Sequence, residues 1–182
     1  ALRHQGLVST RRGRAGGSFV QTPPDPSAGL LRNRLANLSL GDLRDLCDHY
    51  AAISGAAARL AADRGSPEDA ERVRARAQAL TVAEDPGDRR RAECAFHVEV
   101  AAAAQSPRLT REEIRLQAEI GWVLWLPYAD AAAHERGVEQ HRALTKAIAA
   151  GDCDQARVLA EEHVAENLRD AVRTYRRLTR SR

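Results

Sequence analysis

The chain has 182 residues, and its 28 basic and 25 acidic side chains give a formal net charge of +3. The length predicts one ordinary domain with a small appendage, and so mild a charge does not by itself argue for nucleic acid. Only 4% of the residues are aromatic and runs of Val, Ile and Thr are scarce, so we expect an all-α protein.

Cysteine usage and hydropathy bear on location. Cys47, Cys94 and Cys153 are odd in number and form no CxxC pair, which is typical of reduced thiols. No apolar run approaches the length of a membrane span, and the first residues contain no signal-peptide core. We therefore expect a cytoplasmic location.

The N-terminal residues predict a β-hairpin. Segments 7–10 and 18–21 are short and β-prone, and the basic, glycine-rich stretch 11–17 joins them. A hairpin this short is not stable alone in water, so we expect it to pack on a more N-terminal part of the protein. A flexible basic tip suits phosphates or a narrow minor groove, although a solvated loop explains the composition about as well. The candidate DNA-binding residues are Arg11, Arg12, Arg14, Gly16 and Gly17.

The proline-rich stretch 22–27 predicts a linker, because proline prevents both helix and sheet from continuing. A long helix then opens at Gly41 and ends near Gly65, and its apolar positions step by three and four into one buried stripe. The predicted stripe is Leu43, Leu46, Tyr50, Ile53, Ala57 and Leu60. Ser66 and Pro67 are typical of an N-cap and a first helical position, which predicts that a second helix follows.

A third helix is expected over about 88–105, after Pro86 and Gly87 break the second. A fourth should begin near Thr110, with Glu112 and Glu113 in its first turn.

This fourth helix contains the most hydrophobic stretch of the chain, 120–128, in which Pro127 should cause a kink or an interruption. Trp122 and Trp125 are candidates to line a ligand cavity, although aromatic residues in such a stretch more often belong to a core or a dimer face.

Gly137 should separate this segment from a helix that bears His141 and ends at 151–152. Asp152 can cap the last helix, which bears His163 and continues to a basic end.

Three histidines and one carboxylate lie at positions where a helix should turn inward. Glu93 and His97 are four residues apart, so they share one helical face. His141 heads an apolar row with Leu144 and Ile148, and His163 follows Ala156 and Leu159 at similar spacing. Each histidine alone is explained as well by a core imidazole bonded to a carbonyl. Together they favour a divalent metal that takes nitrogen and oxygen ligands.

Motifs along the chain resemble the GntR family of bacterial transcription regulators, in its FadR-type branch. Residues 2–8 and 16–20 resemble the end of that family's winged helix-turn-helix, and the remainder resembles its helical effector-binding domain. The resemblance places a wing and linker at 1–24 and the effector-binding domain at 25–182. The motifs in that domain are Asp45-Leu46, 58–62, Phe96-His97, 107–109, 141–152, Ala156-Arg157 and Glu162-His163.

The resemblance implies an antiparallel bundle of six or seven helices and a metabolite-responsive DNA-binding regulator, with repression as the expected mode and a homodimer as the expected assembly. Many members hold a divalent metal through an acidic residue, the histidine four positions later and two later histidines. Here these positions are Glu93, His97, His141 and His163, and zinc, nickel or manganese is the expected ion.

The chain departs from the family pattern in three places. The acidic ligand is usually Asp, and Glu93 is one methylene longer, so its carboxylate should approach differently or act through water. The Arg and Glu that often clamp a small carboxylate are replaced by Tyr50 and Ser54, which remain the candidate effector-binding positions beside Trp122 and Trp125. Because tyrosine offers one neutral donor where arginine offers a charged fork, we expect a less acidic or larger, flatter effector. The usual Gly-Asn before Pro107 is Gln105-Ser106.

Two other functions compete with the regulator. Three histidines and a carboxylate could serve a metal-dependent hydrolase or lyase, for which Asp130 and His134 are the candidate second cluster. A break at Gly137 would place both of these nearer a surface. Alternatively, the histidines are structural and the effector site is vestigial.

Overall fold

The computed structural model describes residues 8–11, 17–20, 39–121 and 130–180, and the chain divides into the units Ala1–Ser39 and Leu40–Arg182. In the first unit, strands β1 (Val8–Arg11) and β2 (Gly17–Val20) pair antiparallel, with Val8 opposite Val20 and Arg11 opposite Gly17. The predicted hairpin is therefore present, with β1 beginning and ending one residue later than expected and β2 one residue earlier.

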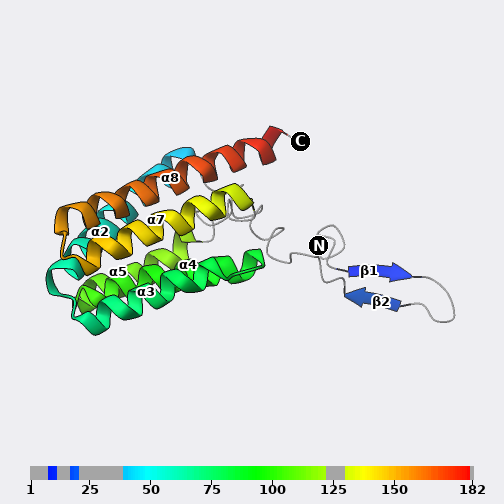
Figure 1. The fold of residues 1–182 in the computed structure, drawn as a ribbon. Coiled ribbons are helices and arrows are strands. Elements are labelled where there is room, and N and C mark those ends of the chain that lie inside the picture. The colour runs from blue at the N-terminus through cyan, green and yellow to red at the C-terminus, as the bar shows by residue number, and fades with distance from the viewer. Residues whose placement is uncertain (1–7, 12–16, 21–38, 122–129, 181–182) are drawn as a thin grey trace. The chain divides into compact units, whose positions relative to one another are not determined.

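The second unit is a helical bundle, as expected. Its described elements are α2 (Leu40–Arg64), α3 (Pro67–Thr81), α4 (Pro86–Ala103), α5 (Pro107–Leu116), the π-helical segment η1 (Gln117–Gly121), α7 (Ala131–Ala149) and α8 (Cys153–Arg180). Figure 1 shows α2, α7 and α8 side by side, and α3 packs against both α4 and α7. None of the described helices combines the length and the apolar character needed to cross a bilayer.

Capping residues set the starts of these helices. Ser66 and Asp69 form a reciprocal capping box at α3, in which the Asp69 N–H donates to Ser66 Oγ at 3.1 Å and the Ser66 N–H donates to Asp69 Oδ2 at 2.9 Å. Asp85 caps α4, so Pro86 opens that helix two residues before the predicted start. Proline suits this position because its fixed φ is helical and its missing N–H would have no partner there.

The start of α5 was predicted three residues too late. The helix begins at Pro107 and not near Thr110, so Glu112 and Glu113 lie in its second turn. The turn before it has Gln105 in the left-handed region with φ 53°, where glycine is usual. The Gln105 side chain donates to the carbonyl of Arg64 at 2.9 Å, which ties this turn to the end of α2.

The prediction of a helix break at Gly137 is wrong. Helix α7 runs unbroken through this buried glycine from its N-cap, Asp130. A glycine costs a helix only about 1 kcal/mol, so burial of the residues around it outweighs the penalty. The helix is followed by Gly151 at φ +69°, and Asp152 caps α8 by accepting from the Gln155 N–H at 3.1 Å.

The core of the bundle is rich in alanine, which lets the helices approach closely. On α2, Leu43, Tyr50 and Ala57 of the predicted stripe are buried, whereas Leu46, Ile53 and Leu60 are only half-buried. Cys47, Ser54 and Ala58 are buried as well. The small residues face the partner helices, so the face is rotated from the one predicted by large apolar side chains. At Gly55 a Cβ would lie 2.6 Å from Glu161 Oε1 of α8, which shows how near the two helices come.

Candidate metal centre

Four buried side chains converge inside the second unit. Glu93 and His97 come from α4, His141 from α7 and His163 from α8. None is more than 2% exposed, and one ligand atom from each lies within 4.8 Å of the others. We call these four residues the carboxylate–imidazole cluster.

The three imidazoles present the same nitrogen to the carboxylate. Glu93 Oε2 lies 3.1 Å from Nε2 of His141, 3.6 Å from Nε2 of His97 and 3.9 Å from Nε2 of His163. Glu93 thus reaches the imidazoles directly, in spite of its extra methylene. Four ligands about 2.1 Å from one tetrahedral ion would be separated by about 3.4 Å, so the observed spacing is close to that of a coordination shell.

Aromatic contacts hold two of the rings in place. Phe96 stacks on His141 with ring centroids 3.8 Å apart and an interplanar angle of 15°. The Tyr50 ring lies 6.0 Å from the His97 ring at a tilt of 60°. Both aromatic residues are fully buried, so packing fixes the orientation of the His97 and His141 rings.

The cluster is electrostatically suited to a cation. Burial lowers the pKa of His141, and it lowers the pKa of His163 well below the ordinary value, so both favour the neutral form. Burial alone would raise the pKa of Glu93, but the adjacent imidazoles, His141 first, hold this pKa below its ordinary range. No lysine or arginine is buried among the described residues, so the carboxylate has no fixed cation beside it.

Unsatisfied polar atoms provide an independent test of fit. Neither oxygen of Glu93 and neither ring nitrogen of His141 makes a hydrogen bond, although all four atoms are buried. Buried polar groups nearly always have partners, and a divalent ion would provide one to the carboxylate and to each Nε2. The donor set of three nitrogens and one oxygen fits zinc, nickel or manganese.

A second polar network adjoins Tyr50. The Gln117 amide donates to Tyr50 Oη at 2.7 Å and to Glu113 Oε1 at 2.9 Å, while Cys94 Sγ donates to Gln117 Oε1 at 3.3 Å. Burial, and then the nearby Glu113 carboxylate, raises the pKa of Tyr50 well above its ordinary value. Sequence reasoning missed Glu113 and Gln117, whose only signal was their four-residue spacing.

The remaining effector candidates are partly described. Ser54 is buried one turn after Tyr50 on α2, whereas Trp122 and Trp125 lie outside the described residues. Among the candidate DNA-binding residues, the backbones of Arg11 and Gly17 form one end of the β1–β2 pairing. The others, Arg12, Arg14 and Gly16, also lie outside the described residues.

The candidate second cluster does not assemble around Asp130. This residue is exposed and caps α7 by accepting from the Ala133 N–H at 3.2 Å. His134 is buried two turns before His141, contrary to the surface position predicted for it. Within the described ranges, the carboxylate–imidazole cluster is the one group of three or more histidine, cysteine, aspartate or glutamate side chains that lie close enough to share an ion.

Two amides that the sequence did not single out hold His163. Gln140 Oε1 lies 2.7 Å from His163 Nδ1, and Asn167 Nδ2 lies 3.0 Å from His163 Nε2. Gln140 directly precedes His141 on α7, and Asn167 follows His163 by a single turn on α8. Amides are common on solvated helical faces, so this spacing alone would not have identified them.

Comparison with known proteins places the chain in a family. Residues 45–166 match the FCD domain family. The chain is 41% identical over 169 residues to "Putative HTH-type transcriptional regulator RmpR" of Mycobacterium gastri, covering 92% of this chain and 62% of that protein. It is 32% identical over 138 residues to "Probable D-xylose utilization operon transcriptional repressor" of Paenarthrobacter nicotinovorans, covering 74% of this chain and 60% of that protein.

The chain therefore spans less than two thirds of the length of these two relatives. Among solved structures, the fold resembles E. coli McbR/YncC with a TM-score of 0.68 and 17% identity, over 96% of this chain and 81% of that one.

Proposed function

The chain belongs to the FCD-domain family, the FadR-type branch of the GntR regulators, and on this premise we propose that it is the sensing part of a metabolite-responsive transcriptional regulator. The two relatives reported above are described as a "putative" transcriptional regulator and a "probable" transcriptional repressor. We therefore propose a sensing and not a catalytic role, with repression as the expected mode and the cytoplasm as the location.

The observation that carries the proposal is the carboxylate–imidazole cluster itself. A buried carboxylate facing three Nε2 atoms, without a buried lysine or arginine among the described residues, supports a divalent metal site. We propose zinc, nickel or manganese as the ion. When bound, it would supply a Lewis acid to which an oxygen of a small effector can coordinate.

The proposed effector pocket adjoins the cluster on the side of α2. Tyr50 and Ser54 are buried there, and Trp122 and Trp125 are proposed to complete the wall. Glu113 adds a second buried carboxylate near Tyr50, and no buried guanidinium among the described residues would offset a dianion. These features support an effector that is less acidic than a simple dicarboxylate.

DNA is the proposed partner of the N-terminal segment. Residues 1–24 are proposed to be the wing and linker of a winged helix-turn-helix, and 25–182 the effector-binding domain. Arg11, Arg12 and Arg14, with Gly16 and Gly17, would contact phosphates and position the protein without reading the bases. In a homodimer, effector binding would change the spacing of two such DNA-reading heads.

Metal analysis combined with a thermal-shift screen tests the sensor. The protein should retain about one equivalent of zinc, nickel or manganese, and His163→Ala should lose it together with the metal-dependent part of its thermal stability. A metabolite library should then contain compounds that stabilise the wild type only when metal is present. A wild-type protein that retains no metal at neutral pH would support the vestigial site instead.

DNA binding by residues 1–182 alone should be weak, salt-dependent and without sequence preference, because a wing contributes mainly phosphate contacts. Nanomolar, sequence-specific binding in a gel-shift assay would contradict the assignment of 1–24 as a wing.

A further inference from the structure

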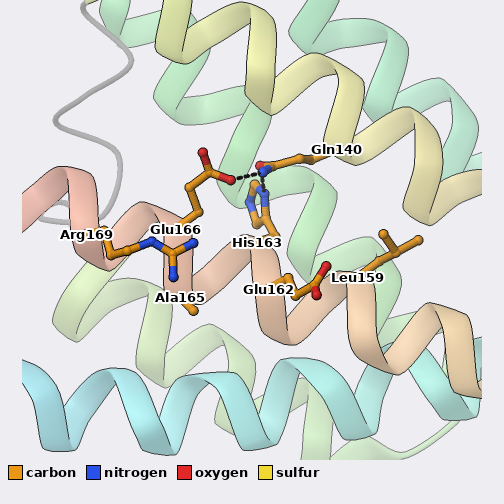
Figure 2. Close-up of a pocket in the computed structure, with 7 residues that line it drawn as sticks. All are labelled: Gln140, Leu159, Glu162, His163, Ala165, Glu166 and Arg169. Atoms are coloured by element: carbon orange, nitrogen blue, oxygen red, sulfur yellow. Dashed lines mark hydrogen bonds between the residues drawn. The ribbon is translucent and has the colours of Figure 1, made fainter.

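A chain of hydrogen bonds leads away from His163 on the side opposite the cluster. His163 Nδ1 lies 2.7 Å from Gln140 Oε1, and Gln140 Nε2 donates to Glu166 Oε2 at 2.5 Å. Figure 2 shows both bonds beside a cavity of about 260 Å³ between α7 and α8. The other carboxylate oxygen of Glu166, Oε1, is 3.3 Å from Arg136 Nε of α7.

These hydrogen bonds determine which nitrogen of His163 carries the hydrogen. The Glu166 carboxylate can only accept, so the group of Gln140 that faces it must be the NH₂. The carbonyl oxygen of Gln140 then faces His163 and also can only accept, so Nδ1 must carry the hydrogen. Nε2 is left with its lone pair, and Nε2 is the atom that lies 3.9 Å from Glu93 Oε2.

The contact on the other nitrogen is consistent with this tautomer. Asn167 Nδ2 lies 3.0 Å from Nε2, where an amide NH₂ donates to a lone pair in the metal-free protein; this hydrogen bond would be replaced when Nε2 binds an ion. Asn167 is 5% exposed, so its position is set by packing within the bundle.

We propose that Gln140 and Glu166 are positioning residues, which hold His163 in the Nδ1–H tautomer and so set the metal affinity of the cluster without touching the ion. The inference rests on the metal site proposed above. A hydrogen bond from the second nitrogen of a ligating histidine fixes the ring and raises its basicity, and losing such a partner typically costs about 10–100-fold in metal affinity.

Gln140 and Glu166 should contribute unequally to metal affinity, and the contribution of Glu166 should depend on Gln140. Gln140 touches His163, whereas Glu166 acts only by orienting Gln140. Arg136 also forms an ion pair with Asp170 Oδ2 at 2.9 Å. Glu166 is therefore held by an arginine that a second carboxylate of α8 also fixes. Removing Glu166 frees the Gln140 amide to rotate, which should weaken the effect without abolishing it.

Glu162 provides a matched control. It lines the same cavity one residue before His163, but among the described residues it makes no hydrogen bond or ion pair. A change in the charge of the cavity alone should therefore affect Glu162→Gln as much as the Glu166 variant.

The experiment measures Zn²⁺ affinity by competition with a chromogenic chelator in the wild type, Gln140→Met, Glu166→Leu, the double variant and Glu162→Gln. We expect Gln140→Met to weaken binding by about 10–100-fold and Glu166→Leu by less. The double variant should bind no more weakly than Gln140→Met, because the two residues act in series. Glu162→Gln should match the wild type.

Nitrogen-15 NMR of the histidine side chains in the metal-free protein gives a readout that a merely structural role would not change. His163 should be the Nδ1–H tautomer in the wild type and in Glu162→Gln, and it should lose this preference in Gln140→Met. An Nε2–H tautomer in the wild type, or an unchanged tautomer and Zn²⁺ affinity in Gln140→Met, would overturn the inference and leave the metal sensor standing. A wild type that shows the predicted tautomer but binds no metal would instead overturn both the sensor and the effect on affinity.

Discussion

Replacing Glu93 with Gln should lower the stability of the metal-free protein and also reduce the stabilisation that metal adds. The substitution keeps the size of the side chain and removes its charge. Glu93 is fully buried, with Nε2 atoms at 3.1, 3.6 and 3.9 Å from its Oε2. Because the imidazoles hold the pKa of Glu93 below its ordinary value, the ionised carboxylate stabilises the metal-free fold at neutral pH, so Glu93→Gln should lower the free energy of unfolding by about 1–3 kcal/mol.

With metal, the same substitution removes the only anionic ligand. At a free metal concentration about 1,000 times the dissociation constant, binding stabilises the wild type by about 4.1 kcal/mol. If the variant binds about 100-fold more weakly, the same concentration stabilises it by only about 1.4 kcal/mol. At roughly 3 °C per kcal/mol for a unit of this size, the metal-induced rise in Tm should fall from about 12 °C to about 4 °C.

Differential scanning calorimetry with EDTA and with excess Zn²⁺ measures both effects. Glu113→Gln is the matched control, because Glu113 is also a buried glutamate but bonds to Gln117 and lies outside the cluster. Its metal-induced shift should equal that of the wild type. If Glu93→Gln leaves the metal-induced shift unchanged, Glu93 does not bind the ion and the reasoning is refuted.

Three further predictions follow from the contacts of single residues. Tyr50→Phe removes a buried hydroxyl that accepts an amide hydrogen bond, so urea unfolding should show a loss of about 1–2 kcal/mol; calorimetry that finds tight binding of a small dicarboxylate, equal in both proteins, would count against Tyr50 as an effector residue. Phe96→Leu removes the ring stacked on His141 and should cost about 1–2 kcal/mol and weaken Zn²⁺ binding; unchanged affinity would show that stacking does not orient the ligand. The hydrogen bond from the Ser66 backbone N–H lowers the pKa of Asp69 in the folded protein. The stabilisation by the ionised Asp69 is therefore complete above the unfolded pKa near 3.8 and is lost as pH falls through the lower folded pKa. Denaturant unfolding across this pH range should show that the free energy of unfolding of Asp69→Asn depends less on pH than that of the wild type.

Local features were predictable from the sequence where one residue determines them. Ser66 and Pro67 gave the start of α3, because capping needs only the neighbouring backbone. The four-residue spacing of Glu93 and His97 placed both on one inward face, because helix geometry alone fixes that relation. Gly137 misled the prediction because propensity is weak and packing decides, as in the unbroken α7.

The convergence of the site depends on tertiary packing and could not come from spacing. His141 and His163 lie on different helices, and their approach to Glu93 depends on how α7 and α8 pack against α4. We predicted that they share one ion because three histidines and Glu93 all lie at inward helical positions and because the chain resembles the family. Gln140 and Asn167 were missed because an amide acquires its role only from the partner that packing brings to it.

An anomalous difference map from a crystal of the metal-loaded protein, collected at the absorption edge of the loaded ion, tests the central claim most directly. The account predicts one strong peak per chain between Glu93 Oε2 and the Nε2 atoms of His97, His141 and His163. A map without a peak there, or with its peak at another site, would contradict it.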